Sequence, residues 1–233
     1  MTVDDATVRT CAALARRAYA APAYLGGFRD EIFLEHRETD TQAYLVPHDA
    51  QGVCYLAFRG TQERRDWATN LRAWMVRTPA GWVHAGFLRA WRGIAAEIAS
   101  RPEAAGALAR ARRVVFCGHS LGGALATLAA ALAPAAAAAG AGARVCVTFG
   151  SPRVGGRSFR RAFARAGIAG ARYAIQADPV PRVPTALAAY CHVRGGVTLD
   201  PNASCAAWVC DMVRTPVDDH DMARYEELVA NRG

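Results

Sequence analysis

Hydrophobic residues recur along the chain with two different periods, and together they predict a sheet interleaved with helices. Short apolar runs rich in β-branched and aromatic residues are typical of buried strands, and they occur at residues 41–46, 53–58, 114–117, 145–149 and 173–177. Helical spacing of apolar residues occurs at residues 4–20, 87–98, 124–132, 157–165 and 222–229. This alternation predicts an α/β fold with a mostly parallel central sheet and helices on both faces. A polar, turn-rich connection between the first two strands predicts an antiparallel N-terminal hairpin.

The sequence GHSLGG at residues 118–123 lies between the predicted strand 114–117 and the predicted helix 124–132. A serine in such a sharp strand-to-helix turn is exposed above the sheet, and the flanking glycines leave room for neighbouring backbone. The helix that begins after Ser120 also directs backbone N–H groups and the positive end of its dipole towards an anion formed there. The pattern therefore predicts a nucleophile elbow around Ser120, in preference to a glycine-rich turn that merely ends a strand.

This segment, extended to GHSLGGALA at residues 118–126, resembles the class 3 (fungal-lipase-like) lipases of the α/β-hydrolase superfamily. Other similar segments occur in the order of the family: AFRGT at 57–61, DW at 66–67, VHAGF at 83–87, TFGSPRVG at 148–155, DPVPRVP at 178–184 and DHDM at 219–222. The resemblance implies an α/β-hydrolase fold, and the length of 233 residues predicts a single domain over residues 1–233. The resemblance further implies a serine carboxylic-ester hydrolase that acts on lipid esters, of the triacylglycerol lipase type, and needs no metal or organic cofactor.

A serine hydroxyl needs an imidazole within hydrogen-bonding reach and a carboxylate that orients the imidazole. In α/β-hydrolases these groups follow one another in the order nucleophile, acid, histidine, which leaves His192 and His220 as candidates for the base. We prefer His220, because it lies in a polar loop before the last helix, where the resemblance also places the base. His192 lies in the strand-like residues 190–193. As the acid we prefer Asp178, at the end of a predicted strand, over Asp200.

Two further features of the site depend on the resemblance. It places the first oxyanion-hole donor at the backbone N–H of Thr61, and the elbow supplies the second at Leu121. After Thr61, a set of large apolar residues recurs at helical spacing with arginines nearby: Trp67, Leu71, Trp74 and Met75. In the family this region forms a lid that opens at a lipid surface. An ordinary helix with Trp67 in the core fits the same spacing, so both interpretations stay open.

The sequence leaves the substrate open, because loops set the geometry of the acyl pocket. Phospholipids and short-chain or feruloyl-type esters would use the same triad as triacylglycerols. A lipase-like scaffold that binds a partner without catalysis is an alternative from a different class. Such relatives usually lose a triad member, whereas this chain keeps all three candidates.

The charge of the chain bears on its partners. All 28 basic residues are arginine, and the formal net charge is +8. This charge favours transient contact with anionic surfaces such as phospholipid head groups, whereas no basic run interleaved with aromatic residues indicates a nucleic-acid partner. The longest apolar stretch, residues 124–139, is interrupted by Pro134 and is too short for a transmembrane segment. A monomer is the default expectation. No signal peptide is visible, which predicts a cytoplasmic protein or a mature secreted form without its leader.

The chain has seven cysteines. Four lie in apolar patterns and are expected to be small buried residues: Cys11, Cys54, Cys117 and Cys146. Three others cluster late in the chain and could include one disulfide: Cys191, Cys205 and Cys210. No spacing of these residues suggests a zinc site.

Overall fold

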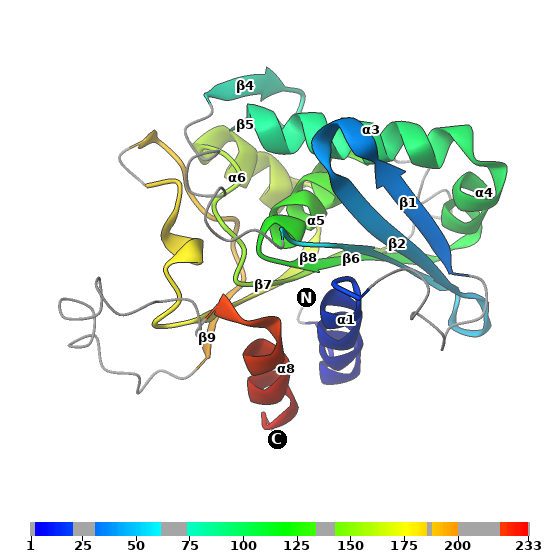
Figure 1. The fold of residues 1–233 in the computed structure, drawn as a ribbon. Coiled ribbons are helices and arrows are strands. Elements are labelled where there is room, and N and C mark those ends of the chain that lie inside the picture. Colours follow the sequence, from blue (N-terminus) through cyan, green and yellow to red (C-terminus); the bar gives the residue numbers. More distant parts are fainter. Residues whose placement is uncertain are drawn as a thin grey trace.

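The computed structural model describes residues 3–20, 31–61, 74–133, 143–185, 188–199 and 220–232. Its centre is a sheet of seven strands in the order β1-β2-β3-β6-β7-β8-β9 (Figure 1). The strands are β1 (Ile32–His36), β2 (Thr41–His48), β3 (Val53–Phe58), β6 (Arg113–His119), β7 (Ala143–Phe149), β8 (Ala169–Ile175) and β9 (Gly196–Leu199). The first three are antiparallel, and every pair from β3 to β9 is parallel. The predicted mostly parallel sheet with an antiparallel N-terminal hairpin is confirmed, and β1 adds an edge strand that was not predicted.

Helices cover both faces of this sheet, as predicted (Figure 1). One face carries α1 (Asp5–Arg17) and α8 (Met222–Ala230). The opposite face carries α3 (Ala85–Ser100), α4 (Pro102–Arg110), α5 (Leu121–Leu132) and α6 (Arg157–Arg165). Within the described ranges, none of the helices has the length and apolar character needed to cross a bilayer.

The side chains of β6 contribute to the hydrophobic cores on both faces of the sheet. Successive residues of a strand point to opposite sides, so Val114 and Phe116 pack under α3 and α5, whereas Val115 and Cys117 pack under α1 and α8. Because both sides are buried, the strand is a continuous apolar run and does not alternate with polar residues. The same burial holds for the four cysteines predicted to be internal.

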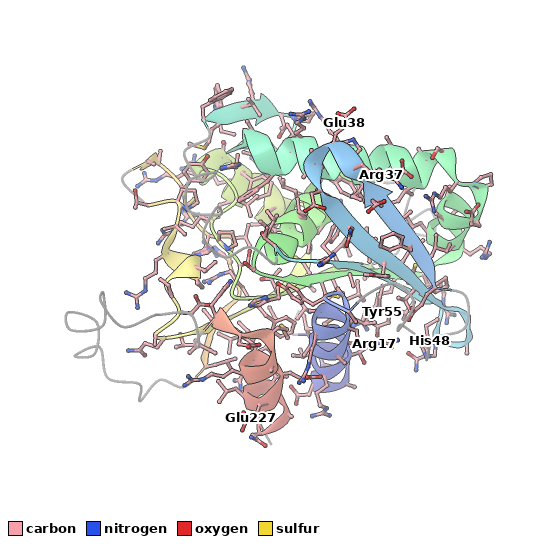
Figure 2. The ribbon with its side chains drawn as sticks, viewed as in Figure 1. Arg17, Arg37, Glu38, His48, Tyr55 and Glu227 are labelled. Carbon is pink, nitrogen blue, oxygen red and sulfur yellow. The ribbon has the colours of Figure 1, made fainter. Side chains whose placement is uncertain are left out.

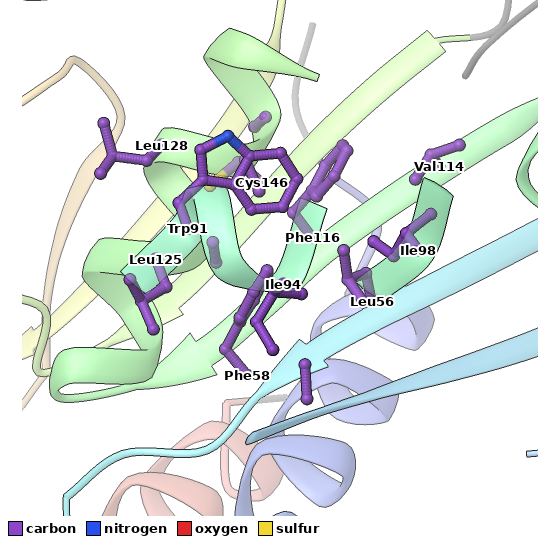
Figure 3. Close-up of a cluster of buried hydrophobic side chains, with 14 of the residues drawn as sticks. Leu56, Phe58, Trp91, Ile94, Ile98, Val114, Phe116, Leu125, Leu128 and Cys146 are labelled. Carbon is purple, nitrogen blue, oxygen red and sulfur yellow. The ribbon is translucent and has the colours of Figure 1, made fainter. Parts of the chain in front are cut away.

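The core beneath α3 and α5 positions the start of α5 above the sheet. Figure 3 shows Trp91 and Ile94 of α3 packed near Phe58 of β3 and Leu125 of α5. The rings of Phe58 and Trp91 meet edge to face, with centroids 6.1 Å apart. Helix α5 is buried on almost all sides because its small residues allow it to lie directly on the sheet.

The opposite face is closed by the two ends of the chain. Helix α1 begins at the N-cap Asp4, whose carboxylate accepts a hydrogen bond from the Thr7 N–H at 2.8 Å. Tyr55 of β3 and Arg17 of α1 both lie on this side of the sheet (Figure 2). Helices α1 and α8 pack next to each other, so the N- and C-terminal segments jointly cover the strands that carry the site.

A separate two-stranded hairpin, β4 (Met75–Thr78) and β5 (Gly81–His84), lies outside the main sheet (Figure 1). Met75 pairs with His84 in this hairpin, so the helical spacing predicted to reach Met75 is wrong at that residue, because backbone pairing there overrides the periodicity. Trp74 directly precedes the hairpin and is exposed. The other two lid candidates, Trp67 and Leu71, lie outside the described residues.

Candidate active site

Ser120 occupies the turn between β6 and α5 in a strained backbone conformation. Its φ of 57° and ψ of −127° lie outside the regions that residues with a side chain favour, at a cost of about 1–3 kcal/mol. The surroundings hold this geometry, because the Ser120 N–H donates to the Phe149 carbonyl at 3.0 Å and its own carbonyl accepts from Gly123 N–H at 3.0 Å. The structure therefore forms the strand–turn–helix arrangement of a nucleophile elbow.

The glycines of this turn are required by close backbone contacts. A Cβ atom at Gly122 would lie 2.2 Å from the Phe58 carbonyl oxygen, and one at Gly118 would lie 2.5 Å from the carbonyl of Gly122. Any side chain at either position would push α5 away from β3 and β6. The prediction that Gly118 and Gly122 leave room for neighbouring backbone is thus confirmed.

The three residues predicted as a triad meet at this turn. The His220 Nε2 atom lies 2.8 Å from Ser120 Oγ, and His220 Nδ1 lies 2.7 Å from Asp178 Oδ2. Asp178 is fully buried, whereas His220 keeps a small exposed fraction. A continuous line of hydrogen bonds therefore leads from a buried carboxylate through the imidazole to the serine hydroxyl.

Asp178 receives two further hydrogen bonds that hold its carboxylate in place. The Val180 N–H donates to Oδ1 at 2.8 Å, and the hydroxyl of the fully buried Tyr225 donates to Oδ2 at 2.6 Å. Burial and the neighbouring Asp178 raise the pKa of Tyr225 well above its usual value, so the hydroxyl keeps its proton and stays a donor. Its oxygen also accepts from the Ile175 N–H at 3.0 Å. The sequence pattern identified Tyr225 only as an apolar residue of the last helix.

Gly150, at the end of β7, makes room for the acid and the base. Its φ of +56° suits glycine, and a Cβ there would lie 2.9 Å from Asp178 Oδ2 and 3.0 Å from the His220 ring. The predicted strand 145–149 ends just before Gly150, but the contact of Gly150 with the site follows only from the fold.

The ring of His119 packs against the ring of His220, and Tyr19 in turn contacts His119. The ring of His119 is tilted by 34° to that of His220, with centroids 4.5 Å apart. The hydroxyl of Tyr19, after the end of α1, is 2.8 Å from His119 Nδ1. Gly60 allows this approach, because a Cβ there would lie 2.0 Å from the Tyr19 hydroxyl. The N-terminal segment thus reaches the surroundings of the base, a contact that no local motif could indicate.

The two residues predicted as oxyanion donors face one small cavity. This cavity of about 140 Å³ is lined by both Thr61 and Leu121. Leu121 is the first residue of α5, where backbone N–H groups have no partner within the helix. The Thr61 Oγ1 atom is buried and makes no hydrogen bond to any residue that the structure describes. Both residues therefore border the same space beside the elbow.

The alternatives considered from sequence lie elsewhere. His192 Nε2 is 2.6 Å from the Pro181 carbonyl oxygen, and burial, together with the positive charge of Arg172, lowers the pKa of His192 to about 3. The Cys191 thiol forms no disulfide with another cysteine that the structure describes. Asp200, Cys205 and Cys210 lie outside the described residues.

A larger cavity of about 830 Å³ lies at the β1 edge, beside α3 and α4, and no residue of the elbow, 118–123, lines it. Its lining is mostly charged and includes Glu35, Glu97 and Arg101. Such a lining suits water and ions better than an acyl chain. The elbow, and not the larger cavity, is therefore the candidate active site.

Comparison with known sequences points to one family. Residues 55–188 match the sequence model of the family described as Lipase (class 3), which is more than half of the chain. The chain is 34% identical over 168 residues to secreted mono- and diacylglycerol lipase 1 of Fusarium solani, a match that covers 70% of this chain and 49% of the relative. The chain spans about half the length of the curated relatives it matches.

Comparison of structures gives the same fold. Lipase II from Rhizopus niveus is 26% identical, with a TM-score of 0.69 over 84% of this chain and 82% of that one. A triacylglycerol lipase whose catalytic centre is described as a serine protease triad is 23% identical, with a TM-score of 0.74 over 92% of each chain. The second similarity, at that level of identity, supports the fold alone.

Proposed function

The chain belongs to the class 3 lipase family, and we propose that it hydrolyses carboxylic esters of lipids through an acyl-enzyme on Ser120. The observation that carries this proposal is the hydrogen-bonded line from Asp178 through His220 to Ser120, with distances of 2.7 and 2.8 Å. A serine held in a strained turn at the end of that line has no evident structural task. Its geometry suits nucleophilic attack.

In the proposed reaction, Ser120 Oγ attacks the ester carbonyl while His220 Nε2 takes the hydroxyl proton. Asp178 stabilises the imidazolium that forms and holds the ring in the tautomer with the proton on Nδ1. His220 then gives the proton to the leaving alcohol, which leaves the acyl group on Ser120. Water, deprotonated by the same imidazole, attacks this acyl-enzyme, releases the carboxylic acid and restores the serine.

The negative charge on the carbonyl oxygen would be held in the cavity beside the elbow. Backbone N–H groups of Thr61 and Leu121 are the proposed donors, and the buried Thr61 hydroxyl is a third group available there. Removing one such donor typically lowers kcat about 100- to 1000-fold. The positive end of the α5 dipole adds to the stabilisation.

The names of the relatives guide the proposed substrate class. The Fusarium solani relative is a mono- and diacylglycerol lipase, and other similar proteins are lipases. We therefore propose acylglycerols, with glycerol esters of fatty acids as the first substrates to test.

The test is hydrolysis of p-nitrophenyl esters of increasing chain length and of emulsified di- and triacylglycerols. We expect Ser120→Ala to lower kcat/KM about 10⁴- to 10⁶-fold, because the nucleophile is lost. Ser151→Ala is a matched control: Ser151 is a buried serine just after the neighbouring strand β7, and its hydroxyl donates a hydrogen bond to the Pro152 carbonyl at 3.1 Å. It should retain activity. A folded wild-type protein that hydrolyses no ester would overturn the proposal.

A further inference from the structure

Two tryptophans are exposed beside an arginine-rich helix. Trp74 is 75% exposed and Trp82 is 48% exposed, although both are large and apolar. The hairpin that contains Trp82 is fastened to the start of α6, because the Trp82 N–H donates to Ser158 Oγ at 3.0 Å and its carbonyl accepts from Gly156 N–H at 3.0 Å. The hairpin therefore lies next to the start of α6 (Figure 1).

All charged residues on the exposed side of α6 are arginines. Phe159 and Phe163 point into the core, so the arginines of the helix are left on the exposed side. We call the combined area the Trp–Arg surface, and it consists of Trp74, Arg77, Trp82, Arg157, Arg160 and Arg161. No carboxylate within the described ranges forms an ion pair with these arginines.

The sequence explains why these charges are uncompensated. No aspartate or glutamate occurs between residues 67 and 96 or between residues 104 and 177, the two segments that contain the hairpin and α6. In the neighbouring helix α3, by contrast, an arginine near the start has an acidic partner. Arg89 pairs at 3.5 Å with Glu38, at the turn between β1 and β2 (Figure 2). Among the described residues, the Trp–Arg surface is thus a cationic area whose arginines have no carboxylate partner, with two exposed indole rings.

We propose that the Trp–Arg surface docks the protein onto an anionic lipid surface. Indole rings favour the head-group level of a bilayer, where one side of the ring is apolar and the N–H is hydrated. Guanidinium groups bind phosphates through paired hydrogen bonds, and each arginine near an anionic membrane strengthens binding about fivefold. The indole rings therefore suit the boundary between the apolar and polar parts of the bilayer, and the arginines suit its phosphate groups.

This inference extends the proposed function, because an acylglycerol hydrolase meets its substrate at a lipid surface. It also uses a part of the chain that does not overlap the triad. Docking can therefore be measured on a protein that cannot hydrolyse anything, and the two proposals can fail independently.

The experiment measures binding of the Ser120→Ala protein to vesicles by co-sedimentation. We expect it to bind phosphatidylcholine vesicles that contain phosphatidylglycerol at least about tenfold more tightly than vesicles of phosphatidylcholine alone, and to lose this preference at high salt. Adding Arg160→Gln and Arg161→Gln should weaken binding to the anionic vesicles about 30-fold. Adding Trp82→Ala should weaken it about tenfold, because an indole ring no longer enters the interface.

The matched control removes the same charge elsewhere, with Arg9→Gln in α1 and Arg110→Gln in α4, two exposed arginines away from the Trp–Arg surface. This variant should bind almost as well as the parent. With Ser120 restored, the Arg160/Arg161 and Trp82 variants should hydrolyse a soluble short-chain ester at the wild-type rate, which also shows that they fold. Equal loss in the control and test variants, equal binding to both vesicle types, or binding to RNA but not to vesicles would each overturn the proposal.

Discussion

His220 has a negatively charged neighbour, whereas the charged groups near His192 are positive. This difference decides whether a histidine can act as a base. His220 lies between the Asp178 carboxylate and the Ser120 hydroxyl, with a partner on each ring nitrogen. His192 lies against the Pro181 carbonyl, and burial, together with the positive charges of Arg172 and Arg153, lowers its pKa. A base must carry a proton during the reaction, so it needs a nearby negative charge.

Both histidines follow Ser120 and Asp178 in the sequence, as the order of the triad requires, but they have different roles. At a pKa of about 3, His192 is neutral at neutral pH, and a neutral ring that faces a carbonyl must donate from Nε2. Its hydrogen bond holds the short helix Val180–Arg182, which begins two residues after Asp178. His192 therefore supports the position of the acid, whereas His220 is the proposed base.

The largest effect is expected when the same substitution is made at both histidines. Glutamine donates a hydrogen bond but takes up no proton, so His220→Gln should lower kcat/KM about 10⁴- to 10⁶-fold. His192→Gln can still donate to the Pro181 carbonyl and should keep activity to within about tenfold, the value of one hydrogen bond near the site. Hydrolysis of a soluble p-nitrophenyl ester measures both. Similar losses in the two variants would remove the distinction between base and support.

The sequence alone was sufficient for the parts of the molecule that depend on short segments. The apolar run before Ser120 and the small residues after it predict the elbow, because a strand, a tight turn and a helix each have a local pattern. The choice of His220 over His192 was also possible from sequence, but only with the order of the triad in α/β-hydrolases and the resemblance to the family. The arginines around His192 come from separate strands and loops, and their effect appears only after folding.

Elements with weak local signals were missed for physical reasons. The edge strand β1 is short, and the hairpin β4–β5 lies outside the main core, so neither needs a long apolar run. Tyr225 is an ordinary amphipathic residue of a helix until α8 packs beside β8. The pairing of its hydroxyl with Asp178 then depends on residues that are far apart in the chain.

A smaller effect is expected from Tyr225→Phe, which tests how Asp178, the proposed acid, is held in place. The variant keeps the packing of the ring but removes the donor to Asp178 Oδ2 and the acceptor for the Ile175 N–H. A hydrogen bond to a charged group is worth about 1.5–3 kcal/mol, so we expect kcat/KM to fall about 10- to 100-fold. Steady-state kinetics and urea unfolding should be measured together. A loss of stability with unchanged activity would show that Tyr225 supports the fold alone.

The effect that is smallest at neutral pH, and that grows in acid, concerns the stability of His192→Gln. The unfolded chain binds a proton at His192 below about pH 6.5, whereas the folded protein binds one only near pH 3. Between these values protonation favours the unfolded chain, so His192 lowers the free energy of unfolding by up to about 1.4 kcal/mol for each pH unit of acidification. Glutamine does not titrate. The variant should therefore be close to wild type at neutral pH, to within about 1 kcal/mol, and should become the more stable protein as the pH falls. Urea unfolding across this pH range measures the difference. Parallel stability curves would mean that His192 takes up its proton at the same pH in the folded protein as in the unfolded chain, and could therefore serve as a base.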